Sequence, residues 1–162
     1  MNVLGDRVLE LGPKPGENGR YRHFRLTRDA DGVAWLLFDR EGSSANTLSA
    51  DVIEELDTVL AALESERPAG LVIRSAKKSG FIAGADVNEF RGARDPRAVE
   101  TAIGRAHAVI DRLEALKIPS VAVIHGFCLG GGCYLSATLP SSRNRFLSCP
   151  AVNLCFGRIF SR

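Results

Sequence analysis

The stretch of sequence that decides the fold is residues 121–132, which reads VAVIHGFCLGGG. Its first four residues are apolar, which predicts a short strand buried on both faces. Gly130–Gly132 follow this strand, and we expect a helix to begin after them. At such a junction, free amide hydrogens and the positive end of the helix dipole converge on one point. That point suits an anion, or an oxyanion that develops during a reaction.

The glycine run excludes several other kinds of site. It is not a dinucleotide fingerprint, because Leu135 stands where the third glycine of that motif would be. No Gly-Lys-Ser/Thr follows it, which excludes a phosphate loop. The chain also has no G-x-S-x-G segment, so a serine hydrolase of that type is not indicated.

The segments before this stretch alternate between strand and helix patterns. We expect a hairpin of residues 21–27 and 33–38, joined by the turn-forming cluster Asp29–Gly32, and a further buried strand at 71–73. Apolar residues at spacings of three and four predict two amphipathic helices, with buried faces made of Val52, Ile53, Leu56, Val59, Leu60 and Leu63 in the first and of Val99, Ile103, Ala106, Ile110 and Leu113 in the second. This order predicts an α/β fold with right-handed parallel crossovers.

A second glycine-containing loop, residues 79–90, reads SGFIAGADVNEF. Small residues at 83–85 let a ligand come close to the backbone. Asp86 and Glu89 have the spacing of a capping box, so we expect Asp86 to cap a helix and Glu89 to reach back to it. The alternative is that these two carboxylates act as acids beside a site. Ser49 is expected to cap the first long helix.

Charge and cysteine content limit the partners. The chain has 162 residues and a net charge of +2, and five Lys and Arg but no Asp or Glu follow Glu114. These charges are too dispersed to predict nucleic-acid binding. The four cysteines have no zinc-site spacing, so we expect thiols and no metal: Cys128, Cys133, Cys149 and Cys155. No secretory signal and no apolar run of about 20 residues is found, so we expect a cytoplasmic protein without a membrane span.

Two segments carry a family resemblance when taken together. Phe81–Asp86 (FIAGAD), followed by Ile124–Gly132 (IHGFCLGGG), closely resembles the enoyl-CoA hydratase/isomerase (crotonase) superfamily, and Gly42–Leu48 looks like the segment after its first hairpin. The resemblance covers roughly residues 20–135. Within the superfamily, these segments are most similar to the hydratase/isomerase portion of the multifunctional fatty-acid oxidation α-subunit. The resemblance implies a crotonase-like ββα spiral with a parallel sheet, truncated here after the glycine-rich turn.

The resemblance also implies a site and a substrate. The backbone amides of Ala85 and Gly131 would form an oxyanion hole for the thioester oxygen of a 2-enoyl-CoA, a substrate of fatty-acid β-oxidation. Substrate-binding positions would be Ala83, Val87, Gly130 and Gly132. Lys77 and Lys78 are either contacts for the CoA phosphates or solvated loop residues, and the second reading is favoured. No cofactor is implied, because coenzyme A is part of the substrate. Family members are often trimers or parts of a multienzyme complex.

The sequence departs from the family where the carboxylates of a hydratase are expected. Tyr134 stands in place of the first glutamate, and Ala151, after Pro150, in place of the second. Adding water to an enoyl thioester needs a base near neutral pH, and a phenol with an ordinary pKa of about 10 is a poor substitute. His125 is either a base or, as we favour, a hydrogen-bonded structural residue. Two functions remain open: an enoyl-CoA hydratase/isomerase, or a non-catalytic acyl-CoA-binding or interaction fragment.

The expected organisation has three parts. Residues 1–20 are a loose lead-in, residues 21–136 a partial crotonase-like acyl-CoA-binding domain, and residues 137–162 an atypical tail, frame-shifted or disordered. A parallel sheet is normally covered on both faces. Because the later turns that the resemblance implies are absent here, we expect an exposed apolar patch and self-association.

Overall fold

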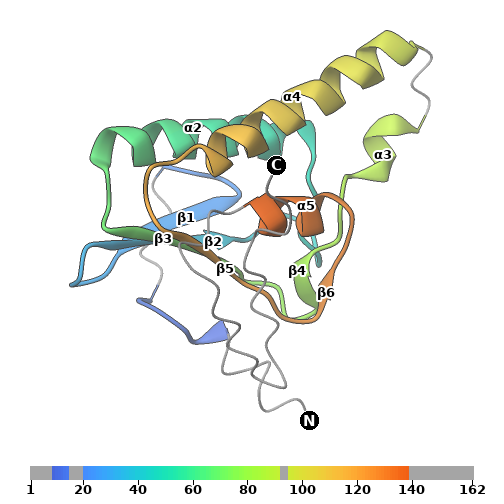
Figure 1. Cartoon of the computed structure of the whole chain (residues 1–162). Coiled ribbons are helices and arrows are strands. Elements are labelled where there is room, and N and C mark those ends of the chain that lie inside the picture. The colour runs from blue at the N-terminus through green and yellow to red at the C-terminus, as the bar shows by residue number, and fades with distance from the viewer. Residues whose placement is uncertain (1–8, 15–19, 92–94, 139–162) are drawn as a thin grey trace.

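The computed structural model describes residues 9–14, 20–91 and 95–138 of the chain. Its main element is a four-stranded sheet in the order β1-β2-β3-β5 (Figure 1). The strands are β1 (Phe24–Arg28), β2 (Val33–Phe38), β3 (Gly70–Ser75) and β5 (Ser120–Val123). β1 pairs antiparallel with β2, and β2, β3 and β5 are mutually parallel. The expected hairpin and α/β parallel sheet are therefore confirmed.

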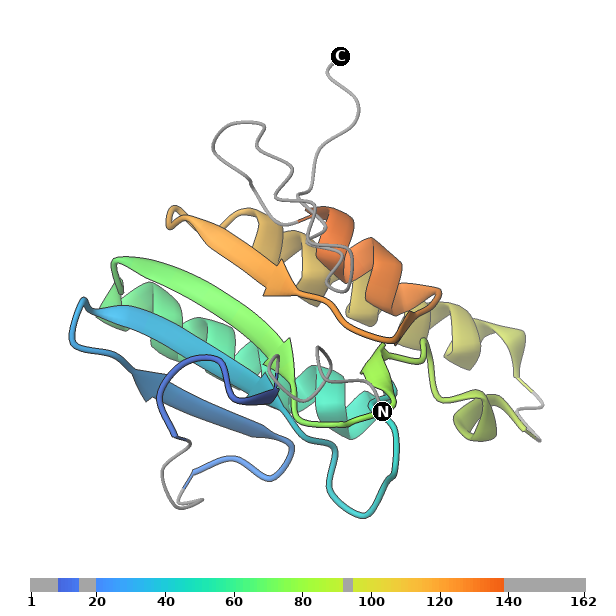
Figure 2. The ribbon, with the colours of Figure 1, turned by 90° about the horizontal axis from the view of Figure 1, so that it is seen from below.

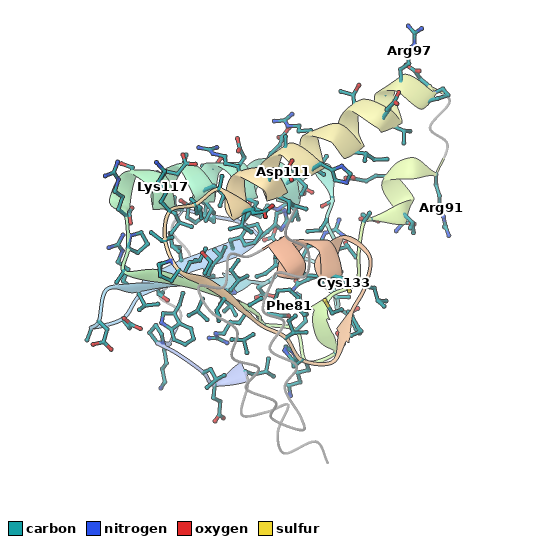
Figure 3. All side chains as sticks on the ribbon, viewed as in Figure 1. Phe81, Arg91, Arg97, Asp111, Lys117 and Cys133 are labelled. Carbon is teal, nitrogen blue, oxygen red and sulfur yellow. The ribbon has the colours of Figure 1, made fainter. Side chains whose placement is uncertain are left out.

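Two long helices connect the parallel strands. The helices α2 (Ala50–Glu66) and α4 (Pro96–Glu114) lie together on one face of the sheet (Figures 1 and 2). All six apolar positions expected for the first helix are buried. On α4, however, only the second half reaches the core. Ile110 and Leu113 are buried, whereas Ile103 is 45% exposed. The first turns of α4 project beyond the sheet, where Figure 3 labels Arg97, and so have little to pack against.

The opposite face of the sheet is contacted by residues 9–14 (Figure 2). Alternate residues of a strand point to opposite faces, so Ala34 and Leu36 join the helix-side core while Trp35 faces away from it. The backbone of Gly12 packs on the Trp35 ring, closely enough that an added Cβ would lie 2.3 Å from it. Arg74 is buried, and its guanidinium donates to the carbonyl of Leu9 at 2.9 Å. Residues 9–14 of the expected loose lead-in are thus in contact with the sheet.

A second, two-stranded sheet carries the two glycine-containing loops. β4 (Gly80–Ile82) pairs in parallel with β6 (Phe127–Cys128). The short helix α3 (Val87–Phe90) follows β4, and α5 (Gly131–Thr138) follows β6. Residues 139–162, most of the expected atypical tail, lie outside the described residues.

One buried asparagine holds the loop after β2 to both sheets. Asn46 is fully buried, and its side-chain amide donates to the carbonyls of Phe38 and Phe81 and to the Ser75 hydroxyl at 2.9–3.2 Å. Its amide oxygen accepts from the Arg40 backbone N–H at 2.9 Å. Because buried polar groups are costly when unpaired, this side chain fixes where the loop lies against β2, β3 and β4.

We predict that Asn46→Asp lowers the free energy of unfolding by about 2–4 kcal/mol at neutral pH, because a carboxylate cannot donate to the three acceptors around it. Protonating the buried carboxyl restores one donor, so the pKa of Asp at this position would be raised in the folded state. The loss should then be smallest in acid and grow as the pH rises above about 4. Urea unfolding at several pH values measures this, and a loss independent of pH would contradict it.

Candidate functional site

The two glycine-containing loops leave the same end of the small parallel sheet. Ile82 of β4 pairs with Cys128 of β6, and the Leu129 N–H donates to the Ile82 carbonyl at 2.9 Å. Because the strands are parallel, the residues after Ile82 and those after Cys128 emerge side by side. The topology therefore brings together two segments that are more than forty positions apart in the sequence.

The backbones of the two loops are in contact at Gly84 and Gly130. Both have positive φ, +96° and +48°, a conformation that L side chains rarely adopt. A Cβ added to Gly84 would lie 3.4 Å from the carbonyl oxygen of Leu129, and one added to Gly130 would lie 3.7 Å from the Cα of Gly84. Glycine at both positions lets Ala85 and Gly131, the next residues of each loop, approach one another.

The amide hydrogen of Ala85 is directed by its pairing with Leu48. The Leu48 N–H donates to the Gly84 carbonyl at 2.8 Å, and the Asp86 N–H donates to the Leu48 carbonyl at 3.1 Å. Successive peptide groups of an extended chain point in opposite directions. The N–H of Ala85 therefore points away from Leu48, and Gly131, as the first residue of α5, has an N–H with no helical acceptor.

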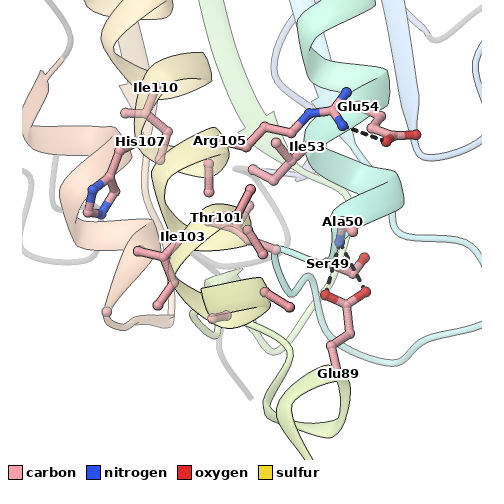
Figure 4. Close-up of a pocket in the computed structure, with 17 residues that line it drawn as sticks. Ser49, Ala50, Ile53, Glu54, Glu89, Thr101, Ile103, Arg105, His107 and Ile110 are labelled. Atoms are coloured by element: carbon pink, nitrogen blue, oxygen red, sulfur yellow. Dashed lines mark hydrogen bonds and ion pairs between the residues drawn. The ribbon is translucent and has the colours of Figure 1, made fainter. Parts of the chain in front are cut away.

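Both residues line one cavity of about 600 Å³, within the size range of ligand sites. Figure 4 shows the walls that come from α2 and α4, and the glycine turns add Ala85, Gly130 and Gly131 to the lining. Small and apolar residues make up much of the lining, among them Ile53, Ala98, Ala102, Ile103, Ala106 and Ile110. The cavity thus combines an apolar wall with two backbone amides. The N–H of Ala85 points away from Leu48, and the N–H of Gly131 has no acceptor within its helix.

Of the six predicted site residues, three line this cavity and three do not. Ala85, Gly130 and Gly131 belong to the lining. Gly132 is buried beneath the turn, where an added Cβ would lie 2.6 Å from Ile82. The Ala83 N–H is already bound to the Asn46 carbonyl at 2.8 Å. Val87 is 64% exposed at the start of α3.

Asp86 is a structural carboxylate, as the capping interpretation predicts. It caps α3 by accepting from the Asn88 N–H at 3.0 Å. It also pairs with the Arg40 guanidinium at 2.7 Å. The hydrogen bond from Arg40, with that from Asn88 next in size, lowers the pKa of Asp86 from its usual range. Asp86 is therefore held ionised, away from the cavity lining.

The prediction that Glu89 reaches back to Asp86 was wrong. Its carboxylate does not reach back to Asp86 but accepts the Ala50 N–H, with both oxygens at 3.0 Å (Figure 4). Ala50 is the first residue of α2, where the helix dipole attracts a carboxylate. The Ser49 hydroxyl, expected to cap this helix, donates to Asp51 instead. Glu89 thus caps α2 from another element and lines the cavity.

Several cavity residues escaped the sequence analysis. Glu54 and Arg105 form an ion pair at 3.0 Å between α2 and α4, and Thr101 and His107 line the same space (Figure 4). Each stands beside an apolar position of its helix, as Glu54 does beside Ile53. The helical periodicity predicts that such residues lie at the edge of the buried face. It does not predict which edge lines a cavity, because this depends on how the two helices pack.

His125 and Lys77 are engaged outside the cavity. His125 is buried, and its Nε2 lies 2.7 Å from the Lys77 carbonyl oxygen, as expected for a structural histidine. The Lys77 ammonium pairs with Asp39 at 2.7 Å and donates to the Arg40 carbonyl at 2.8 Å. The solvated-loop interpretation therefore does not hold for Lys77, whereas Lys78 is exposed. Tyr134 lies within α5, and Ala151 lies outside the described residues.

Comparison with known proteins decides the family. The family model for enoyl-CoA hydratase/isomerase matches residues 33–142. The chain belongs to the enoyl-CoA hydratase/isomerase family. Its resemblance to the crotonase superfamily is thereby confirmed.

Relatives within this family share both sequence and fold. The fatty acid oxidation complex subunit alpha of Shewanella sp. (strain W3-18-1) is 43% identical over 114 residues, which is 70% of this chain and 16% of that protein. The enoyl-CoA hydratase structure from Mycobacterium smegmatis has a TM-score of 0.66 at 26% identity, covering 72% of this chain and 45% of that one. The enoyl-CoA hydratase structure from Bacillus anthracis has a TM-score of 0.65 at 29% identity, and the match again covers 72% of this chain and 45% of that one. The chain thus spans under half of these structures and about a sixth of the Shewanella protein.

The part of the chain that the structure describes contains no group of three or more His, Cys, Asp or Glu that could hold a metal ion. Within the same residues, no helix has the length and apolar character needed to cross a membrane.

We predict that Asp86→Asn, which keeps a capping oxygen but removes the charge, destabilises the fold by about 1 kcal/mol at pH 7. Since pairing lowers the folded-state pKa, the wild-type carboxylate contributes its stability above its ordinary pKa of about 4 and loses it as the pH falls through the lower folded value. Urea unfolding of both proteins at pH 7 and in acid should therefore show a difference that vanishes in acid. An equal difference at both pH values would refute the ion-pair account.

Proposed function

We propose that this chain binds the acyl-CoA thioester of fatty-acid β-oxidation and holds its carbonyl oxygen between the amides of Ala85 and Gly131. The observation that carries the proposal is the contact between the two glycine turns, with Ala85 and Gly131 in the wall of one cavity. The reaction class we propose is that of enoyl-CoA hydratases and isomerases, acting on 2-enoyl-CoA. No cofactor is needed, since coenzyme A is part of the substrate.

Backbone amides suit this role for a physical reason. When water adds to the β-carbon, or a proton leaves the α-carbon, negative charge builds on the thioester oxygen as an enolate. Amides fixed on a tight turn and at a helix start need little reorganisation to stabilise that charge. Loss of one such donor typically lowers the rate by about 10²–10³. The apolar cavity wall from α2 and α4 is suited to the acyl chain.

The acid–base groups favour a second candidate, a non-catalytic acyl-CoA-binding fragment. Tyr134 replaces the first family glutamate and Ala151 the second. Of the carboxylates that line the cavity, Glu89 is bound to the Ala50 amide and Glu54 to Arg105. Either would have to leave its partner before acting as a base. Both candidates share the thioester-binding step and differ only in turnover.

The relatives suggest the setting. Because the Shewanella relative is named as a subunit of a fatty acid oxidation complex, we propose that this chain also works within a multienzyme assembly in the cytoplasm.

We predict that Gly131→Pro weakens binding of crotonyl-CoA by roughly tenfold or more, because it removes the amide hydrogen at the first position of α5, where proline fits a helix. Gly131→Ala is the matched control, since it adds the same Cβ, 2.9 Å from the movable Leu48 Cδ1, but keeps the N–H. Calorimetric titration measures both. Equal affinities for the two variants would remove Gly131 from the oxyanion hole.

We predict that turnover separates the two candidates. The absorbance of the enoyl thioester falls when water adds across its double bond, so crotonyl-CoA reports hydration directly. Turnover that Glu89→Gln abolishes, with binding intact, would support the hydratase. Binding without any loss of absorbance would support the non-catalytic fragment. If neither signal is found, the thioester proposal fails.

A further inference from the structure

Two cysteines flank the glycine turn of the candidate site. Cys128 ends β6 and is half-buried, and Cys133 lies exposed in the first turn of α5, where Figure 3 labels it. Their sulfur atoms are 3.6 Å apart without a covalent bond between them. The Cys133 thiol also donates to the Cys128 carbonyl at 2.8 Å. A disulfide has a sulfur–sulfur distance of about 2.0 Å, so the atoms need to approach by only about 1.6 Å.

The residues between the two cysteines can absorb this movement. They are Leu129 and three glycines, Gly130–Gly132, which have the widest choice of backbone conformation. Leu129 is 56% exposed and restrained mainly through its backbone. Gly132, in contrast, is packed against Ile82, where even a Cβ would clash. Among these glycines, Gly130 and Gly131 are therefore the less tightly packed, and both line the cavity.

We propose that Cys128 and Cys133 form a reversible intramolecular disulfide whose closure displaces the Gly131 amide and weakens thioester binding. The disulfide itself stands on the sulfur geometry alone, whereas its effect on ligand rests on the proposed function.

The chemistry balances with a low-molecular-weight disulfide as the oxidant. The exposed Cys133, as its thiolate, attacks one sulfur of the oxidant, which breaks the oxidant's S–S bond and releases one small thiol. Cys128 then attacks the mixed disulfide at Cys133, forming the intramolecular bond and releasing the second small thiol. The protein loses two hydrogen atoms, and the oxidant gains them. An added dithiol reverses both steps.

Peptide mapping of the full chain tests the disulfide. Trypsin leaves Cys128 and Cys133 together in peptide 118–143, and Cys149 and Cys155 in peptide 146–158. After incubation with glutathione disulfide and blocking with N-ethylmaleimide, peptide 118–143 should carry no maleimide and be lighter than its dithiol form by two hydrogen masses. Dithiothreitol should restore it. Two maleimides, a lasting glutathione adduct, or a cross-link to peptide 146–158 would each overturn the proposal.

Cys133→Ser is the matched control, because its hydroxyl still donates to the Cys128 carbonyl while the second sulfur is gone. Calorimetry then compares acyl-CoA binding before and after oxidation. Oxidised wild-type protein should bind roughly tenfold more weakly, since displacements of about 1 Å can cost oriented contacts up to 10²-fold, and Cys133→Ser should be unaffected. Equal affinities for reduced and oxidised wild type would overturn the coupling. If reduced protein does not bind acyl-CoA, the proposed function fails, while the peptide map still decides on the disulfide.

Discussion

The close backbone contact between Gly84 and Gly130 is the constraint on which the candidate site depends. It is created by the parallel pairing of two very short strands, β4 and β6, and both residues have positive φ, which favours glycine. Another residue at either position would have to adopt a positive φ, which L residues rarely do. Its Cβ would also lie at van der Waals distance from the opposite loop. Because β4 and β6 pair in parallel, the residues that follow the two glycines, Ala85 and Gly131, come to line the same cavity.

The larger sheet and its helices support that contact from the side. Asn46 ties the loop after β2 to β3 and β4, and Leu48, two residues later, pairs with the Gly84–Asp86 backbone. The same segment leads directly into α2, which forms one wall of the cavity. The buried side chain of Asn46 and the bridge between Leu48 and Ala85 thus connect the core to the loop that lines the cavity.

Charged groups around the cavity serve mainly to hold elements together. Asp86 joins α3 to Arg40, Glu89 caps α2 from α3, and Glu54 pairs with Arg105 across the two long helices. A carboxylate engaged in this way stabilises a helix start or an interface and is less available as a base. The carboxylates that line the cavity are thus occupied in structural contacts, whereas the glycine turns beside them are held by backbone pairing.

The sequence by itself determined the order of the strands of the large sheet and of the two long helices, the buried face of α2 and the family, because hydrophobic periodicity and glycine-rich motifs are local signals in the sequence. It also predicted the capping role of Asp86, since that contact spans only two residues. It did not predict the two short strands β4 and β6, which carry no such periodicity. It could not predict that Glu89 caps α2, that Ile103 is exposed, or that Glu54, Arg105 and His107 line the cavity. Those features depend on where α3 and α4 lie relative to α2. Only the tertiary structure decides this, because helix packing brings together residues whose separation in sequence carries no period or motif.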